Sequence, residues 1–184
     1  KFCDDVIAYA NSQEEVMART GGYGDRKLKK EEIKDLKRKR NSDLVWLNDT
    51  WIYKELHPYV HEANRAAGWN FDWDFSETIQ FTRYKLNQYY HWHADQEAEP
   101  YNNGHPQHEG KIRKLSCTIQ LNHPHEYEGG DLQFRTPHGE FTCNEIKPKG
   151  SICIFPSFVT HRVTTVTSGT RNSLVMWNIG YPYK

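Results

Sequence analysis

The run His91-Trp92-His93-Ala94-Asp95 brings together residue types that bind metal ions. Because side chains alternate between the two faces of a strand, an extended run would put His91, His93 and Asp95 on one face. Imidazole nitrogens and carboxylate oxygens are common metal ligands, so two of the three could bind one ion. The pair His93 and Asp95 is weak support by itself, because a chain with 10 histidines produces such a spacing by chance.

Two residues further along the chain strengthen this hypothesis. His161 follows the run FPSF, and Arg171 stands ten residues later at the start of an apolar strand-like run. A charged side chain in such a strand is costly unless it meets an anion, and a guanidinium suits a carboxylate through paired hydrogen bonds. Ser173 faces the same way and could donate another. The alternative for Arg171 is a structural ion pair with an internal Asp or Glu.

The donor set indicates the kind of metal. Two imidazoles and one carboxylate on one face leave coordination positions open, as a non-haem Fe(II) site requires in order to bind a keto acid and dioxygen. Structural zinc more often receives a closed set of four ligands. The residues therefore favour an iron site at His93, Asp95 and His161.

The elements that must position these residues are mainly strands. From about Thr78, eight short β-rich runs alternate with turn residues, without an intervening helical pattern. We expect a mainly β fold, with a double-stranded β-helix (jelly roll) core over residues 78–184. The long run 96–113, rich in Gly, Pro and Asn, interrupts this rhythm and is a candidate lid loop.

Residues 1–77 are predicted to be helical and to pack on that core within one domain, 1–184. Helical spacing of apolar residues is present in the segments Cys3–Arg19 and Leu47–Ala67. The basic run Arg26–Arg40 predicts a solvated surface helix, with a patch for nucleic acid or an acidic partner as the alternative.

Composition limits the partners and the compartment. Acidic and basic residues balance at 24 each, so there is no overall field to attract nucleic acid or an anionic membrane. The 4 cysteines show no C-x-x-C spacing, and no apolar stretch is long enough to cross a bilayer. We expect a cytoplasmic protein without a membrane partner. The chain begins without Met and looks trimmed, which leaves a removed targeting segment open.

Taken in order, five runs resemble the core of the prolyl 4-hydroxylase-like branch of Fe(II)/2-oxoglutarate oxygenases: FTRYKLNQYYHWHAD, RKLSCTIQLN, EYEGGDLQF, GSICIFPSFVTHRV and TSGTRNSLVMWNIG. The resemblance covers about residues 78–180. It implies that His93, Asp95 and His161 bind catalytic iron. It also implies that Arg171 binds the distal carboxylate of 2-oxoglutarate.

The same resemblance suggests further contacts and shows departures. Tyr84 is similar to a tyrosine that lines the co-substrate pocket, and Trp177 to an aromatic residue near the iron. Gln120 stands where the oxygen-sensing prolyl hydroxylases carry a co-substrate-binding tyrosine, and Thr118 and Ser116 share its face and could substitute. The residues expected at the co-substrate are Arg171, Tyr84, Ser173, Thr118 and Gln120. Those expected at the substrate are Tyr90, His91 and Trp177.

The implied reaction consumes O2 and 2-oxoglutarate, hydroxylates a C–H bond and releases succinate and CO2, with ascorbate as a suggested reductant. A peptidyl, prolyl-like substrate is favoured by analogy with the branch. A nucleic-acid demethylase of the same chemistry is the alternative, although such enzymes usually carry a second arginine where Trp177 stands. A jelly-roll binding module without catalysis is the alternative from another class.

A cupin-like metal site is a competing interpretation of the same histidines. The spacing of His91, His93, Glu97 and Gly104 satisfies the cupin pattern H-x-H-x3-E-x6-G. Cupins with this pattern place a last histidine three residues after a P-x-G turn, where this chain has Cys153. The cupin interpretation also leaves Arg171 without a function.

Overall fold

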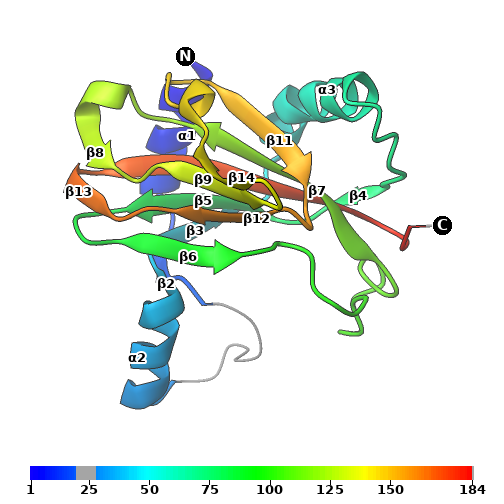
Figure 1. Ribbon diagram of the computed structural model, residues 1–184, viewed down its shortest axis with the longest axis horizontal. Coiled ribbons are helices and arrows are strands. Elements are labelled where there is room, and N and C mark those ends of the chain that lie inside the picture. The colour runs from blue at the N-terminus through cyan, green and yellow to red at the C-terminus, as the bar shows by residue number, and fades with distance from the viewer. Residues whose placement is uncertain (20–27, 184) are drawn as a thin grey trace.

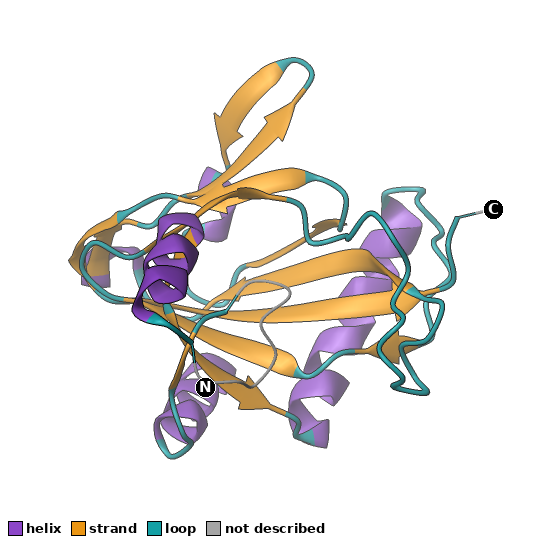
Figure 2. Ribbon diagram, turned by 90° about the horizontal axis from the view of Figure 1, so that it is seen from below, coloured by secondary structure: helices purple, strands orange, loops and turns teal. Residues whose placement is uncertain are grey.

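Two antiparallel β-sheets lie face to face in the computed structural model, which describes residues 1–19 and 28–183 (Figure 1). The major sheet has the strand order β1-β3-β5-β14-β7-β11, with β4 also paired to β14, and the minor sheet has the order β10-β9-β12-β6-β2. A separate pair joins β13 to β8. Figure 2 shows the two layers from the side, with two helices on the far side of the major sheet.

The strands are short, as the turn-rich sequence predicts. The major sheet contains β1 (Val16–Met17), β3 (Asp43–Leu47), β4 (Phe75–Ser76), β5 (Ile79–Tyr84), β7 (Ile112–Gln120), β11 (Ile152–Pro156) and β14 (Arg171–Gly180). The minor sheet contains β2 (Arg40–Asn41), β6 (Tyr89–His93), β9 (Leu132–Thr136), β10 (Gly139–Thr142) and β12 (Thr160–Val163), while β8 (Tyr127–Gly129) pairs with β13 (Val166–Gly169). The expected mainly β, jelly-roll core is confirmed.

Helices α1 (Phe2–Asn11) and α3 (Thr50–Ala66) cover the outer face of the major sheet, whereas α2 (Lys30–Lys39) projects beside the edge of the minor sheet (Figure 1). Apolar side chains of α1 and α3 form the main core with alternate residues of β3, β5, β7 and β14. The core members include Val6, Ile52, Leu56, Phe81, Ile119 and Leu174, all at most 1% exposed. None of the described helices could span a bilayer.

The prediction of a helical N-terminal third was incomplete. In the segment Cys3–Arg19 the helix ends at Asn11, and β1 follows. In the segment Leu47–Ala67 the helix begins at Thr50, because Leu47 closes β3, whose Val45 and Leu47 bury one face of a strand. In the basic run, residues 26 and 27 lie outside the described residues, and Arg40 begins β2 rather than ending a surface helix.

Strand alternation divides the major sheet into two different faces. In β14, Leu174 and Met176 point to the helices and join the apolar core. Arg171, Ser173 and Trp177, from the same strand, point into the space between the two sheets. The helices therefore anchor the sheet from outside, and its inner face is left to carry polar side chains.

Candidate functional site

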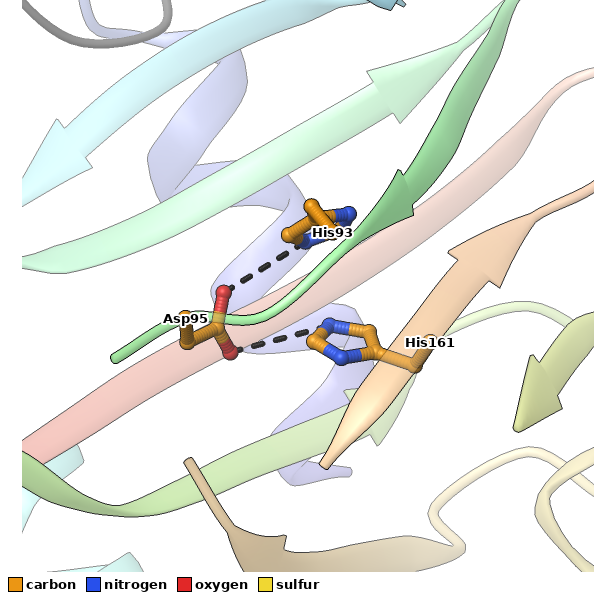
Figure 3. A group of neighbouring side chains, drawn as sticks. All are labelled: His93, Asp95 and His161. Atoms are coloured by element: carbon orange, nitrogen blue, oxygen red, sulfur yellow. Dashed lines mark ion pairs between the residues drawn. The ribbon is translucent and has the colours of Figure 1, made fainter. Parts of the chain in front are cut away.

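The predicted metal-binding residues converge between the two sheets. His93 ends β6, Asp95 lies two residues beyond it, and His161 of β12 is the register partner of His93. Their potential ligand atoms all lie within 4.8 Å of one another, and they are the one such group among the described residues. His93 Nε2 is 3.4 Å from Asp95 Oδ1, and His161 Nε2 is 3.6 Å from Asp95 Oδ2 (Figure 3).

Backbone carbonyls orient both imidazoles in the same way. His93 Nδ1 lies 2.8 Å from the carbonyl oxygen of His91, and His161 Nδ1 lies 3.0 Å from that of Val159. A carbonyl can only accept, so each Nδ1 carries the proton and each Nε2 keeps a free lone pair. Both lone pairs are thus directed to the side where Asp95 lies, as metal ligation requires.

Asp95 is fixed by two serines. The Ser116 hydroxyl donates to Asp95 Oδ2 at 2.7 Å, and the Asp95 backbone N–H donates to the carbonyl of Ser157 at 2.9 Å. The two serine hydroxyls are themselves 2.9 Å apart. The carboxylate is therefore held in one orientation by neighbouring strands, before any metal binds.

Burial and charge shift the pKa values of Asp95 and His161. Burial opposes ionisation of Asp95, but His161, His93 and Arg113 together outweigh it and hold the pKa of this carboxyl far below its usual range. Burial lowers the pKa of His161, against the opposing effect of Asp95. An ionised carboxylate and a neutral imidazole are the forms that bind a cation.

Arg171 lies in the same cavity with an unused donor. It is 2% exposed, and its Nη1 has no hydrogen-bond partner. No acidic side chain of the described residues forms an ion pair with it, so the structural ion pair considered for this residue is absent there. Its guanidinium lies 5.7 Å from the centre of the Tyr84 ring, and the two residues are register partners. A buried cation in this state fits a carboxylate ligand.

Gly130 explains part of the GGDL motif. Its φ is +61°, and a Cβ at this position would lie 2.9 Å from Cδ of Arg171 and 3.0 Å from Cγ2 of Val166. A side chain here would therefore displace the stem of Arg171 and require a strained backbone. The glycine lets the loop pack directly on the arginine.

Most of the other predicted residues line this cavity. Tyr84, Tyr90, Thr118, Ser173 and Trp177 do so, and the indole Nε1 of Trp177 is a second buried donor without a partner. Gln120 is buried but is not among the lining residues; its amide Nε2 reaches the carbonyl of Asn122 at 3.4 Å.

His91 does not share the face of His93, contrary to the expected alternation. The strand pairing matches His161 with His93 and Val163 with Tyr90, so β6 has one extra residue and forms a bulge. Tyr90 consequently lines the cavity and stacks on His93, with ring centroids 3.5 Å apart. His91 is exposed and contacts the ring of Tyr89 instead.

Two cavity residues escaped sequence reasoning, because Arg40 and Gln80 both line the cavity. Ser116 was considered for the co-substrate, and it contacts Asp95 instead. Alternation along the run from Thr78 to Lys85 could have placed Gln80 with Tyr84, since the two stand four residues apart. The sequence did not indicate that Arg40 is buried, because Arg40 is the last residue of a highly charged run.

The loop 96–113 is tied to the rim of the cavity. The Tyr101 hydroxyl donates to Glu77 Oε1 at 2.9 Å, and Arg113 Nε donates to Glu77 Oε2 at 2.5 Å. The Arg113 guanidinium also lies 3.9 Å from the centre of the Trp177 ring. Glu77 thus links Tyr101 of the loop, and Arg113 at the end of the loop, to the aromatic wall of the cavity.

The residues present fit a metal together with an acidic ligand. Two imidazoles and one carboxylate provide three donors, which is fewer than a closed structural site uses. The two buried donors without partners, Arg171 Nη1 and Trp177 Nε1, belong to the same cavity. A ligand rich in acceptor oxygens would satisfy both.

Comparisons with known proteins agree with this geometry. Residues 79–178 match the 2OG-Fe(II) oxygenase superfamily. A PKHD-type hydroxylase of Psychrobacter sp. (strain PRwf-1) is 39% identical over 99 residues, which are 53% of this chain and 36% of that protein. The match therefore spans well under half of the relative's length.

Solved structures share the fold. A viral collagen prolyl hydroxylase from Paramecium Bursaria Chlorella virus-1, in complex with 2OG, superposes with a TM-score of 0.62 at 21% identity and covers 97% of this chain and 89% of its own. A prolyl hydroxylase from Trichoplax adhaerens, in complex with a hypoxia inducible factor peptide fragment, gives 0.57 at 14% identity and covers 97% and 78%.

Proposed function

The chain belongs to the 2OG-Fe(II) oxygenase superfamily, and from this premise we propose that it is a dioxygenase that hydroxylates a C–H bond of a peptidyl, prolyl-like substrate. In the proposed reaction 2-oxoglutarate and O2 are consumed, and succinate and CO2 are released with the hydroxylated product. The observation that carries the proposal is the union, in one cavity, of the His93, Asp95 and His161 cluster with the unpaired donor of Arg171.

His93, Asp95 and His161 would hold Fe(II), which together with 2-oxoglutarate supplies the power to oxidise an unactivated C–H bond. The protein's own contribution is to position the ligands. The carbonyls of His91 and Val159 hold the proton of each imidazole on Nδ1, and Ser116 holds the carboxylate. Because these partners lie in the strands or directly beside them, the site needs little reorganisation to accept a cation.

Arg171 would anchor the distal carboxylate of 2-oxoglutarate. Its guanidinium is buried, and Thr118 and Ser173 line the cavity on neighbouring strands, so their hydroxyls are available to the same carboxylate. Tyr84 packs beneath the guanidinium and restricts its position. Thr118 and Ser173 take the role considered for Gln120, whose side chain does not line the cavity.

A peptidyl substrate is supported by the rim of the cavity. Trp177 and Tyr90 form aromatic walls, and the loop 96–113, tied to Glu77 through Tyr101, stays the candidate lid. The two structural relatives also support a peptidyl substrate, because one is a collagen prolyl hydroxylase and the other was solved with a peptide. His91 is a poorer candidate for substrate contact, because it points away from the cavity.

The alternative functions lack a comparable arrangement. A cupin-like site would need His91 and Glu97, yet both are exposed and belong to no cluster of potential ligands in the described parts of the chain. A nucleic-acid demethylase of this chemistry is disfavoured by position 177, where an indole packs against Arg113.

Succinate release tests the proposal. Purified protein with Fe(II), 2-oxoglutarate and O2 is expected to form succinate, and to form it faster with prolyl peptides than with amino acids or alkylated oligonucleotides. Omitting ascorbate in a parallel sample tests its role as a reductant. If metal-loaded protein releases no succinate under any of these conditions, and no 2-oxoglutarate binds, the proposal fails.

A further inference from the structure

A second buried arginine, Arg40, lines the same cavity as Arg171. It is the first residue of β2, on the minor sheet, and is 5% exposed. Arg171 belongs to β14 of the major sheet. The cavity is thus bounded by two guanidiniums from different sheets, and a co-substrate with one distal carboxylate needs only one of them.

Neutral groups alone surround Arg40 among its described contacts. Its Nε donates to Ser42 Oγ at 3.0 Å, its Nη1 to Gln80 Oε1 at 3.3 Å and its Nη2 to Thr82 Oγ1 at 3.4 Å. The amide of Gln80 donates to the same threonine at 2.8 Å, so the acceptors are themselves fixed. In the part of the chain that the structure describes, no carboxylate forms an ion pair with Arg40.

Three bonds leave two of the five guanidinium N–H donors unused. The positive charge is also uncompensated, and a buried charge without a counter-ion is costly. Both deficits would be removed by one oxyanion that enters the cavity. A neutral carbonyl would satisfy a donor but leave the charge.

Arg40 lies close to the proposed iron site. Its guanidinium lies 4.5 Å from the centre of the Tyr90 ring, and that ring stacks on His93 at 3.5 Å. Arg40 is therefore separated from a proposed iron ligand by a single aromatic ring. An anion held there would lie on the side of the cavity that Tyr90 and His93 line.

With Fe(II) and 2-oxoglutarate bound in the cavity, the sum of the charged groups would still leave Arg40 without a counter-ion. If Fe(II) and the 2-oxoglutarate dianion were bound, their charges would cancel, and the charge of Asp95 would offset that of Arg171. Arg113 is paired with Glu77. A single positive charge remains, and it is that of Arg40.

We propose that Arg40 binds a carboxylate of the substrate, so that the oxidised residue carries this group close to the oxidised carbon. A C-terminal peptidyl residue or a free imino acid has this chemistry, and an internal prolyl residue does not. The inference rests on the proposed function for the reaction, but its test concerns binding alone.

The test uses matched probes without turnover. The protein is loaded anaerobically with Mn(II) and 2-oxoglutarate, and N-acetyl-L-proline is compared with N-acetyl-L-prolinamide, which differs only in its carboxylate. Proton relaxation caused by Mn(II) reports binding of either probe near the metal. The carboxylate is expected to bind about ten-fold more tightly or better, as a charge-assisted hydrogen bond predicts.

Variants assign the preference to Arg40. Arg40→Gln should remove it and Arg40→Lys should retain part of it, while the affinity for 2-oxoglutarate stays within about two-fold. Arg38→Gln, which changes a largely exposed arginine of α2, should alter neither. Thermal denaturation confirms that each variant is folded.

Three results would overturn the inference. The first is equal behaviour of the two probes, whether both bind or neither does. The second is a preference that survives in Arg40→Gln. The third is loss of 2-oxoglutarate binding in Arg40→Gln with normal binding in Arg171→Gln, which would make Arg40 the co-substrate anchor. None of these depends on succinate release, so failure here is distinct from failure of the proposed function.

Discussion

The same strands give the major sheet an apolar outer face and a polar inner face. On the outer face, Leu174 and Met176 of β14 and Ile119 of β7 pack against α1 and α3, and each is at most 1% exposed. On the inner face of the same strands, Arg171, Ser173 and Ser116 are at most 2% exposed, but they are polar.

The difference shows where this chain gives up stability for chemistry. Burying a polar group costs free energy unless it is hydrogen-bonded, yet Gln120, Arg171 and Trp177 each leave one buried atom without a partner. The apolar outer face contributes the hydrophobic stabilisation that tolerates this cost. Neighbouring substitutions in one strand should therefore affect different properties.

The largest effect is expected from His161→Ala on the inner face. It removes a proposed iron ligand, so activity should fall by more than about 100-fold, beyond the range found for outer partners of metal ligands. Succinate release and Mn(II) titration measure the loss. Stability of the metal-free protein should change little, and an active His161→Ala variant would contradict the assignment.

Leu174→Ala tests the outer face of the same sheet. This side chain is fully buried in the main core, so truncation should lower the free energy of unfolding by about 3 kcal/mol. Denaturant unfolding measures the change, and activity per folded molecule should be preserved at low temperature. A large loss of activity in folded Leu174→Ala would mean that the two faces are coupled.

Arg171→Gln, three residues before Leu174, should have the reverse profile. Losing a charge-assisted contact is expected to weaken 2-oxoglutarate binding roughly 10- to 100-fold, with little loss of stability. Calorimetric titration of 2-oxoglutarate into the Mn(II)-loaded protein measures it. Arg65→Gln, on the exposed surface of α3, is the control that should bind normally.

Ser116→Ala sharpens the comparison by changing one hydroxyl of the inner face. Without the hydrogen bond to Asp95 Oδ2, the carboxylate is less constrained, and Mn(II) affinity should fall about ten-fold. Ser116→Thr, which retains the hydroxyl, should recover much of the affinity. The exposed Ser168→Ala serves as a control, and unchanged affinity in Ser116→Ala would refute the role of this serine.

The smallest effect is expected from His91→Ala, because the bulge in β6 directs this side chain away from the cavity. Metal affinity and succinate release should remain within about two-fold of the parent, as for ordinary surface substitutions. Loss of metal binding in His91→Ala would instead support the cupin-like ligand set of His91, His93 and Glu97.

Much of the fold could be predicted from local patterns. Each of the eight β-rich runs from Thr78 onward contributes a strand, because period-2 alternation is strong where one face is apolar. The N-terminal third was less predictable. There, Asp43–Leu47 is a strand directly in front of a helix, and helical spacing in the longer segment concealed the boundary.

Some residues of the candidate site could also be predicted from the sequence, and others could not. His93, Asp95, His161 and Arg171 could be proposed together because their chemical types are costly in apolar strands without a ligand. Ser116 was visible only through its shared face with Thr118. Arg40 could not be found, because a charged run predicts solvation, whereas here the sheet edge buries its last residue.

The sequence by itself determined the residue types of the site and their order on β-rich segments, since both depend on local composition and periodicity. Tertiary structure alone decided which of two adjacent aromatic and imidazole side chains, Tyr90 or His91, enters the cavity. A single extra residue in β6 reverses the face of every side chain before it. The hydrogen bonds of Arg40 with Gln80 and Thr82, which lie 40 and 42 residues away, likewise exist only once the two sheets have closed.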